Sequence, residues 1–559
     1  MKTPARLKSH LAPVLFLVVL TCAVYARTLG HDFLLNWDDA AYVTGNEAIR
    51  GVTPAHLRQA FTHFYVGNYA PLQIVSYMLD YSLWGLTASG FIASNILLHI
   101  LNGILFYALV TKLTGSRLHA LIAGYIFLLH PVQVESVAWV SQRKNLLAMF
   151  FFLGSFLFYL CRRENGGLKG KLCLGASLAA FTGALLSKSV AIILPPVLIL
   201  YDLCFGEKGD ARKRLADKIP YLVVAVAMAL VTLTSQAAEM GGGKRPDYYG
   251  GTPLATLFTM MPVFFRYLGN LVWPVHLSAA YDPPVKTAID GEVALAAVLL
   301  ILLAVGAVRL YRRQRRLFFW GAIFVVGLVP VAQIIPLVTL MNDRYLYFPM
   351  LGAAPFITSV ALSGVEQVRR PFRLPVIALL VLTLFALPLV SYQRAGVWRD
   401  TLSLWTDVYQ KQPDSVVAGL GLSDTYNFIG RPDLAIPLLE KVLTKVPFNR
   451  DALLNIAENY KELGRFGEAG PHLARLVARY PDFPDGFLAL GDVALLSGDL
   501  AGAEAAYLRA LQLRPASGYA LSYLGIVYAR MQRVDLARDC YRRALAAGED
   551  NVQLREMLR

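Results

Sequence analysis

The stretch FLALGDVALLSGDLAGAEAAYLRALQLRP, residues 487–515, carries the pattern that decides the fold of the C-terminal part of this 559-residue chain. Its glycines, alanines and final proline belong to series that recur along the sequence at a fixed spacing of 34 residues. The positions that share this spacing are Pro413, Pro447, Pro481 and Pro515, then Gly430, Gly464 and Gly498, and then Ala435, Ala469, Ala503 and Ala537. A period of this length indicates one structural unit repeated along the chain.

Within each unit, small and aromatic residues stand where two packed helices need them. Gly491 lets the helices touch, and Tyr507 fills the gap between neighbouring units, while Gly525 and Tyr541 take the same places in the next unit. A helix–turn–helix unit of this length is the tetratricopeptide repeat. We therefore expect three to four repeats over 413–559, stacked as an α-solenoid whose concave face binds a peptide or a partner protein.

The sequence before residue 396 has a different composition. Hydrophobic residues make up 56% of the whole chain, charged residues only 16%, and the mean hydropathy is +0.49. Apolar runs near the ~20 residues that cross a bilayer recur throughout 1–395. We therefore expect an all-α protein, with a polytopic membrane helix bundle over 1–395, a linker helix over 396–412, and then the repeat solenoid. The eleven predicted spans lie near 11–30, 92–112, 119–139, 145–161, 172–187, 190–205, 219–235, 292–308, 317–335, 345–364 and 374–391.

The basic residues predict the orientation of this bundle. The chain has 53 Lys and Arg against 38 Asp and Glu, and the excess gathers in short loops between apolar runs, as in cytoplasmic loops of membrane proteins. These loops are 162–171, 207–218, 309–316 and 366–373. The pattern predicts a cytoplasmic N-terminus and an extracytoplasmic repeat domain, and it argues against nucleic-acid binding. It also requires the apolar stretch 256–273 to be a re-entrant or surface-lying helix.

The cysteines give no sign of a disulfide-based fold. Cys22, Cys161, Cys173 and Cys204 lie in or beside apolar runs, and Cys540 lies alone in the repeat region. Because no two of them form a CxxC pair, we expect no disulfide framework.

Polar and charged side chains gather at the outer ends of the predicted spans. They are Trp37, Asp38 and Asp39 in the first outer loop, His130, Glu135 and Arg143 in HPVQVESVAWVSQRKN (130–145), Lys188 in a short outer turn, and Arg344 at the start of a later span. Charges at membrane depth are costly and commonly mark functional sites. Because acids and bases from separate segments reach the same face, we interpret them as one site.

Each of these residues also has a structural interpretation. Lys188 and Arg344, taken singly, can snorkel to the membrane interface. His130 is typical of a hydrogen-bonding residue at a helix end. Asp38 and Asp39 can cap a helix or bind a structural cation, which leaves a divalent metal at this pair open.

The combination of residue types suits one kind of reaction. A carboxylate can remove the proton from an acceptor hydroxyl. Arginine and lysine can hold and stabilise a phosphate leaving group. Apolar walls between spans can take a long isoprenoid chain. We therefore predict transfer of a sugar from a polyprenyl-phosphate carrier at the outer face of the membrane.

The order of parts resembles the transmembrane and tetratricopeptide-repeat O-mannosyltransferase family and its bacterial relatives, within the GT-C class of glycosyltransferases. The stretches that carry the resemblance are NWDDAAYVTGN, NYAPLQIVSYMLDYSLWG, SNILLHILNGILFY, HPVQVESVAWVSQRKNLLA, LLSKSVAIILPPVLILYD, LGNLVWPVHLSAAYDP and NDRYLYFPMLG, followed by the repeats. They cover nearly the whole chain, and the His-Pro…Glu…Arg stretch is the most specific. Two positions depart from the family: Ser189 stands where an acid is common, and Ala70 where an arginine is common.

The resemblance implies an inverting transferase with an outer-loop aspartate as base and a lipid-phosphate-linked sugar, mannose in the named family, as donor. It implies the acids Asp38, Asp39 and Glu135 as catalytic residues, Arg143, Lys188 and Arg344 as phosphate contacts, and His130 and Trp37 as further residues of the site loops. We slightly favour Asp39 as the base. No cofactor is required by this set, apart from the open divalent cation at the aspartate pair.

Two hypotheses follow. The first is a glycosyltransferase of a bacterial inner membrane, whose repeats bind an acceptor protein or another partner. The alternative is a non-catalytic membrane scaffold, in which the repeats recruit envelope proteins and the polar cluster is structural. An oligosaccharide ligase or a lipid-modifying transferase of the same class is a third, weaker option.

Overall fold

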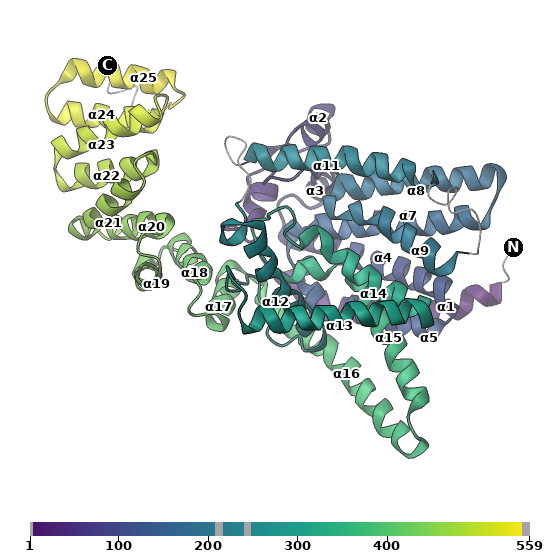
Figure 1. The fold of residues 1–559 in the computed structure, drawn as a ribbon. Coiled ribbons are helices and arrows are strands. Elements are labelled where there is room, and N and C mark those ends of the chain that lie inside the picture. Colours follow the sequence, from purple (N-terminus) through teal and green to yellow (C-terminus); the bar gives the residue numbers. More distant parts are fainter. Residues whose placement is uncertain (1–3, 207–215, 240–246, 550–559) are drawn as a thin grey trace. The chain divides into compact units, whose positions relative to one another are not determined.

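The computed structural model describes residues 4–206, 216–239 and 247–549. In these ranges the chain forms helices and no β-strand, apart from an isolated bridge between Tyr65 and Asn68. The prediction of an all-α protein is therefore confirmed. The chain divides into two compact units, residues 1–404 and 405–559 (Figure 1).

The first unit consists of long helices interrupted by short turns. Its α-helices are α1 (Pro4–Tyr25), α2 (Pro54–Thr62), α3 (Pro71–Trp84), α4 (Ala88–Thr114), α5 (Arg117–Leu129), α6 (Val134–Ala138), α7 (Arg143–Glu164), α8 (Gly167–Ser187), α9 (Leu194–Phe205), α11 (Ile219–Glu239), α12 (Pro253–Val272), α13 (Gly291–Arg313), α14 (Arg315–Leu328), α15 (Met350–Gln367) and α16 (Arg370–Val397). Its short 3₁₀ and π turns are η1 (Ala26–Gly30), η2 (Ala40–Thr44), η3 (Glu47–Ile49), η4 (Pro131–Gln133), η5 (Val140–Gln142), η6 (Ser189–Ile193), η7 (Tyr249–Gly251), η8 (Val329–Val331) and η9 (Asp343–Leu346). The predicted site residues lie in or beside the short turns and at helix ends.

Six helical segments in the described ranges are long and apolar enough to cross a bilayer. They are His10–Gly30, Ala88–Thr114, Val140–Glu164, Gly167–Ser187, Gly291–Arg313 and Arg370–Val397. The helices Arg117–Leu129 and Pro131–Ala138, bent by 52° relative to each other, make a seventh if they form one broken span. The spans predicted at 190–205 and 219–235 fall on shorter apolar helices, and the total of eleven spans stays a prediction. The stretch 256–273, which we expected not to cross, forms α12 and is not among these segments.

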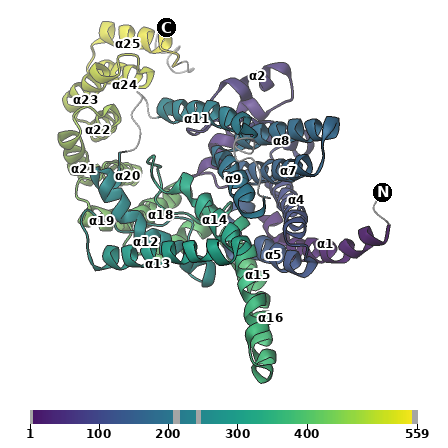
Figure 2. The same ribbon diagram turned by 45° about the vertical axis from the view of Figure 1, so that its right-hand side comes forward.

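Polar side chains join three of the long helices. Ser155 of α7 and Ser177 of α8 each donate a hydrogen bond to the other's backbone carbonyl oxygen at 2.7 Å. Tyr221 of α11 donates to the Ser177 hydroxyl at 2.6 Å. In an apolar environment such bonds add to van der Waals packing between helices, and α7, α8 and α11 run side by side (Figures 1 and 2). The structure also joins Cys161 and Cys173 in a disulfide, contrary to our expectation of none.

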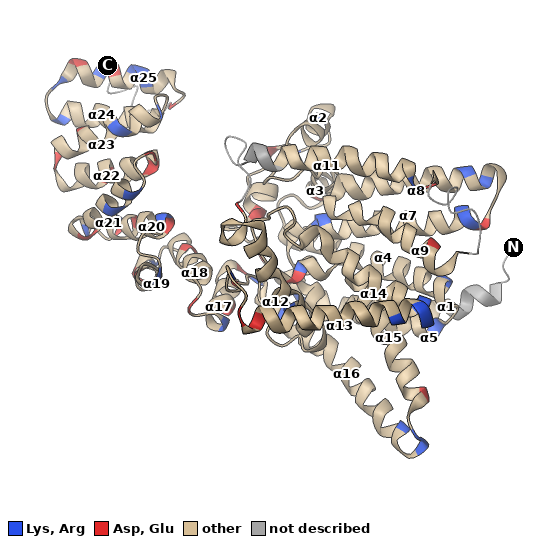
Figure 3. Cartoon of the chain, in the orientation of Figure 1, with Lys and Arg blue, Asp and Glu red and all other residues tan. Residues whose placement is uncertain are grey.

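Basic residues gather at particular helix ends of the first unit. Arg162 and Arg163 lie in the last turn of α7, and Arg312 and Arg313 in the last turn of α13. Figure 3 shows these ends and the turn between α15 and α16 in blue. They belong to the loops from which the sequence predicts the cytoplasmic side. A further predicted basic loop, 207–218, lies largely outside the described residues.

The second unit is a series of helix pairs. The boundary between the two units falls within α17 (Thr401–Lys411). After it come the helix pairs α18 (Val416–Phe428) with α19 (Pro432–Lys445), α20 (Arg450–Glu462) with α21 (Phe466–Arg479), α22 (Pro484–Ser497) with α23 (Leu500–Leu513), and α24 (Gly518–Arg530) with α25 (Val534–Ala546). Gly430, Gly464 and Gly498 follow the first helix of three pairs with φ of 71°, 70° and 86°. Glycine adopts this left-handed conformation without strain, so the same turn recurs in these pairs.

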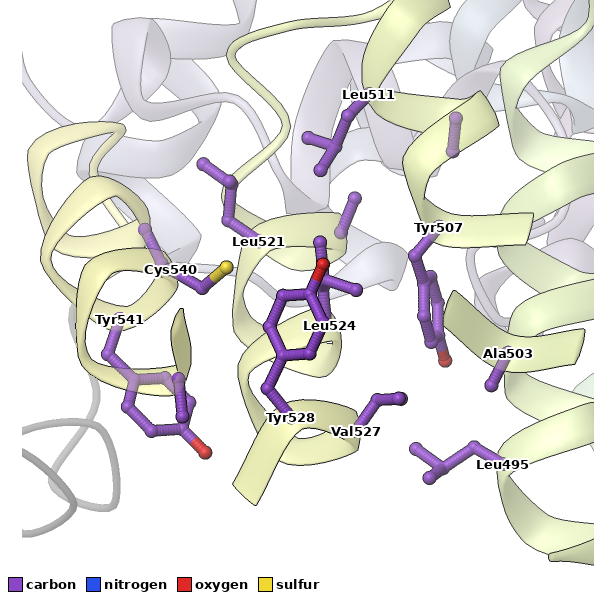
Figure 4. Close-up of a cluster of buried hydrophobic side chains, with 14 residues drawn as sticks. Leu495, Ala503, Tyr507, Leu511, Leu521, Leu524, Val527, Tyr528, Cys540 and Tyr541 are labelled. Atoms are coloured by element: carbon purple, nitrogen blue, oxygen red, sulfur yellow. The ribbon is translucent and has the colours of Figure 1, made fainter. Parts of the chain in front are cut away.

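In the last two helix pairs, an aromatic ring of the second helix faces a glycine of the first. Figure 4 shows Tyr507 and Tyr541 in the last cluster of buried side chains, which draws on α22 to α25. A Cβ atom built on Gly491 would lie 2.6 Å from Cε1 of Tyr507. The glycine is therefore required by the close approach of the ring, as the sequence pattern predicted.

We expect Gly491→Ala to lower the free energy of unfolding of the repeats by about 1–3 kcal/mol, because the added methyl group overpacks this contact. Gly470→Ala is the matched control, since nothing lies within 4 Å of a Cβ built there and alanine favours the helix. Both variants are compared as full chains in increasing urea, and cleavage of the repeat unit by a protease reports the free energy of unfolding. Equal stability of the two variants would contradict the packing described.

Candidate active site

A cavity of about 370 Å³ lies in the first unit, where several of the short turns meet. Its polar lining is Asp38, Asn68, Gln142, Lys144, Asn145, Lys188, Ser189, Thr339, Arg344 and Tyr345. Its apolar lining includes Trp37, Val66, Trp139, Pro330, Val331, Pro336, Leu337, Val338 and Phe348. Of the predicted site residues, the structure thus brings Trp37, Asp38, Lys188 and Arg344 to one cavity.

The two neighbouring aspartates have different surroundings. Asp39 is 1% exposed, and its carboxylate accepts hydrogen bonds from the Leu34 N–H at 3.0 Å, from the Ser141 N–H at 3.0 Å and from the Ser141 hydroxyl. Burial raises the pKa of Asp39 to about 6, although these hydrogen bonds act in the opposite direction. Asp38 lines the cavity, its side chain is 23% exposed, and its Oδ2 lies 3.9 Å from Lys144 Nζ. Asp39 therefore fastens the loop that follows α1 to the turn before α7, whereas Asp38 is the carboxylate that a ligand can reach.

Three cationic side chains line the cavity. Lys144 Nζ donates to the Tyr42 hydroxyl at 3.2 Å, and Lys188 Nζ donates to Asn145 Oδ1 at 2.6 Å. Burial, together with the charges of Lys144 and Arg344, lowers the pKa of Lys188 well below its usual value. A bound anion would offset this repulsion. Three cations beside one lining carboxylate therefore suit the cavity to a phosphate-like group.

Arg344 is held in the cavity by Glu135. The Glu135 side chain is buried, its Oε2 accepts the Arg344 backbone N–H at 2.8 Å, and its Oε1 accepts Arg344 Nη1 at 2.5 Å. The guanidinium lies 5.5 Å from the ring centre of Trp139 and 5.4 Å from that of Tyr345. Glu135 does not line the cavity, so its geometry fits the orienting of Arg344 and not the catalytic role expected from the sequence.

Arg143 does not reach the cavity, contrary to its predicted contact with phosphate. Its guanidinium is buried and pairs with Asp80 at 2.7 Å. It also donates to the Phe91 carbonyl oxygen at 2.6 Å and to Asn95 Oδ1. These partners join α3, α4 and α7, which makes Arg143 part of a structural ion pair. Lys144, the next residue, supplies the cation at this point of the cavity.

His130 and Trp37 differ in their positions relative to the cavity. His130 separates α5 from η4, where its Nδ1 accepts the Val132 N–H at 3.3 Å and its Nε2 donates to the Leu271 carbonyl oxygen at 3.0 Å. It does not line the cavity, and its bonds match the structural interpretation of a residue at a helix end. Trp37 lines the cavity and packs on Trp139, with ring centres 4.5 Å apart. The cavity thus has an aromatic wall.

The structure adds Gln142, Lys144, Asn145 and Tyr345 to the predicted set. Asn145 links Gln142 to Lys188, because it accepts a hydrogen bond from Lys188 and donates one to Gln142 Oε1 at 3.1 Å. The sequence carries one signal for them: SQRKN, residues 141–145, is a run of polar residues between two apolar stretches. Which of these side chains face a common space depends on the turn of the backbone at η5.

The aspartate pair does not fit a divalent cation. Both oxygens of Asp39 already accept hydrogen bonds, which leaves Asp38 alone. Calcium and magnesium need several oxygen ligands. Across the residues that the structure describes, no group of three or more His, Cys, Asp and Glu side chains that could hold a metal ion is found. The option of a metal at Asp38 and Asp39 therefore lacks a ligand set.

Two family models match parts of the chain. The model described as dolichyl-phosphate-mannose-protein mannosyltransferase matches residues 75–234, a segment that includes Lys144 and Lys188. The tetratricopeptide repeat model matches 420–484, 454–518 and 488–552. The prediction of tetratricopeptide repeats is confirmed by this match and by the helix pairs of the second unit.

Curated proteins that are similar to parts of the chain are named protein O-mannosyl-transferases. The protein O-mannosyl-transferase Tmtc2 of Drosophila melanogaster is 31% identical over 37% of this chain and 24% of its own length. The protein O-mannosyl-transferase F38B6.6 of Caenorhabditis elegans is 23% identical over 70% of this chain and 57% of its own length. The chain thus spans between about a quarter and just over half of these relatives. A solved structure of the MamA protein is 24% identical over 26% of this chain and 81% of that chain, with a TM-score of 0.25.

The two kinds of match fall on different parts of the chain. The mannosyltransferase match lies in the first unit, around the cavity, and the repeat matches lie in the second unit. In these parts the chain is similar to proteins named as protein O-mannosyl-transferases and to the tetratricopeptide repeat.

Proposed function

We propose that the chain is a GT-C glycosyltransferase that transfers a sugar, mannose in the named relatives, from a polyprenyl-phosphate carrier to a hydroxyl group of an acceptor protein. The observation that carries this proposal is the cavity in which Asp38 stands among Lys144, Lys188 and Arg344. A transferase that uses a lipid-phosphate donor needs a base for the acceptor and cations for the leaving group. Both are present at one place.

The proposed reaction assigns a role to each of these side chains. Asp38 takes the proton of the acceptor hydroxyl while the hydroxyl oxygen forms a bond to C1 of the sugar. The bond between C1 and the phosphate oxygen breaks, and its electron pair stays on the phosphate. Lys144, Lys188 and Arg344 stabilise the negative charge that builds up there. Attack from the side opposite the phosphate inverts the configuration at C1.

The proposal includes the placement of the chain in a bacterial inner membrane. The basic helix ends support a cytoplasmic side for the N-terminus and an extracytoplasmic side for the cavity and the repeats. We propose the domain limits 1–395, 396–412 and 413–559, with the concave face of the repeats binding the acceptor or another partner. An alkaline phosphatase fused after residue 400 should be active. An inactive fusion would reverse the proposed orientation.

We expect Lys188→Met to lower kcat for sugar transfer on the order of 10²-fold, because one of the three side-chain cations that stabilise the phosphate leaving group is lost. The assay uses the purified chain, a polyprenyl-phosphate-linked radioactive mannose and a serine- and threonine-rich peptide. Lys286→Met is the matched control, since Lys286 pairs with Asp290 and Glu292 and does not line the cavity. Equal rates in the two variants would remove the phosphate role. No transfer by the wild-type chain with any lipid-phosphate sugar would favour the scaffold hypothesis.

A further inference from the structure

The segment that follows α14, residues 329–339, forms one side of the cavity. Its lining residues are Pro330, Val331, Pro336, Leu337, Val338 and Thr339. All but the last are apolar, and they share the cavity with the cations Lys144, Lys188 and Arg344. The same cavity thus has cationic and apolar lining residues.

The same segment exposes large apolar side chains on its outer surface. Ile334 is 67% exposed, Ile335 is 43% exposed and Val338 is 77% exposed. A loop in contact with water would not gather such side chains, because each exposed apolar group orders water at a cost. These residues therefore mark a surface that meets an apolar phase.

Several backbone groups of this segment have hydrogen-bond partners within the protein. Gln333 is buried, donates to the Thr339 carbonyl oxygen at 2.8 Å and accepts the Leu337 N–H at 2.8 Å. The Tyr249 hydroxyl is 3.0 Å from the Leu337 carbonyl oxygen and 2.8 Å from that of Val338. Irregular backbone beside lipid is tolerated only when its polar groups have partners in the protein. The hydrogen bonds and the exposed side chains thus fit contact with hydrocarbon.

Gln333 holds this arrangement in a strained conformation. Its φ is +59°, in the left-handed region that a residue with a side chain enters at a cost. Its two side-chain hydrogen bonds offset that cost and fold the segment back on itself. The shape of the segment is therefore specified by the sequence.

The segment is also connected to the cation Arg344. The Thr339 hydroxyl lies 2.8 Å from the Tyr345 hydroxyl, and Asn342 Nδ2 donates to the Thr339 hydroxyl at 2.5 Å. The Tyr345 ring in turn packs beside the Arg344 guanidinium. A ligand that touches both the segment and Arg344 would meet one connected surface.

We propose that residues 329–339 form the seat of the carrier's isoprenoid chain, where it leaves the cavity for the bilayer. This inference rests on the proposed function, since it takes a polyprenyl phosphate as the occupant. The occupant follows from continuity, because this apolar segment lines the same cavity as the cations and reaches the surface at Val338. A phosphate held by the cations would place the first isoprene units against Pro336 and Leu337. The exposed Ile334 and Ile335 would then contact later units of the isoprenoid.

The first test is crosslinking with the full chain in nanodiscs of phosphatidylethanolamine and phosphatidylglycerol. A polyprenyl phosphate with a diazirine in its first isoprene units is activated by light, and the labelled peptides are identified by mass spectrometry. We expect the label in residues 329–339, and we expect unlabelled polyprenyl phosphate, but not polyprenyl alcohol, to suppress it. Label confined to other lipid-facing helices such as α13 would overturn the inference. Equal labelling by a diazirine phosphatidylcholine would show that ordinary bilayer lipid is the occupant.

The second test uses a pair of double variants. Ile334→Ser with Ile335→Ser should lower the ratio of kcat/KM for a long-chain donor to that for a short-chain donor about tenfold, because the short donor does not reach this surface. The control is Ile301→Ser with Leu302→Ser on α13, whose side chains are also exposed and apolar. An unchanged ratio in the first variant would overturn the inference.

The two tests separate the inference from the proposed function. Crosslinking measures binding and needs no sugar transfer. Label in 329–339 without any transferase activity would support the lipid seat and contradict the proposed reaction. Transferase activity without label there would support the reaction and contradict the lipid seat.

Discussion

Asp38→Asn should lower kcat for sugar transfer on the order of 10²- to 10⁴-fold, while the protein still folds and inserts. The amide cannot take the acceptor's proton, whereas its size and its place beside Lys144 are kept. The assay is single-turnover transfer with the enzyme in excess over the donor and a saturating peptide, so that chemistry and not binding is measured. Thermal unfolding in the same detergent checks that the fold is kept.

Asp39→Asn is the informative neighbour. Asp39 accepts three hydrogen bonds from Leu34 and Ser141, and the amide can replace only part of them. We therefore expect this variant to lose stability, with the residual rate per folded molecule higher than in Asp38→Asn. A stable but inactive Asp39→Asn together with an active Asp38→Asn would identify Asp39 as the base, as the sequence analysis predicted.

Arg143→Met should lower the free energy of unfolding by about 3–5 kcal/mol, because it leaves the Asp80 carboxylate buried without its partner. Removing both charges in Arg143→Met with Asp80→Leu should recover much of this loss, since an apolar pair replaces a buried ion pair. Thermal unfolding of the two variants measures the difference. A stable Arg143→Met that no longer binds polyprenyl phosphate would show that Arg143 contacts the donor after all.

The repeats could be predicted in detail because their packing leaves a periodic mark on the sequence. Gly491 and Tyr507 touch, and the same pair recurs as Gly525 and Tyr541 one period later. Local chemistry and global fold agree at each of these positions. The all-helical fold and the membrane character follow in the same way from composition and the length of apolar runs.

The candidate site could be predicted only to within a residue or two. Asp38 and Asp39, and likewise Arg143 and Lys144, are neighbours whose side chains point in different directions. Consecutive residues of a helix are about 100° apart, since a turn takes 3.6 residues. One member of each pair lines the cavity and the other is buried in hydrogen bonds or an ion pair. The sequence shows the pair but not the turn of the backbone that separates its members.

Hydropathy likewise could not place the ends of the helices around the cavity. The span predicted at 317–335 corresponds to α14, which ends at Leu328, and the apolar residues that follow form the folded-back segment at the cavity. Apolar composition is the same for a helix in lipid and for a loop that faces lipid. Pro330 and Pro336 are the local signals that distinguish the two, because proline lacks the N–H that a continuing helix requires.

The grip of Glu135 on Arg344 has a consequence for turnover. After transfer, the departing polyprenyl phosphate carries a larger negative charge than the donor did, and an unopposed arginine would retain it. Because the Arg344 guanidinium already has a carboxylate partner at 2.5 Å, part of its charge is balanced before any ligand arrives. Under the proposed reaction, the spent carrier would meet a cation that can pair with Glu135 again. We therefore expect the pair that orients the arginine also to shorten the residence time of the product.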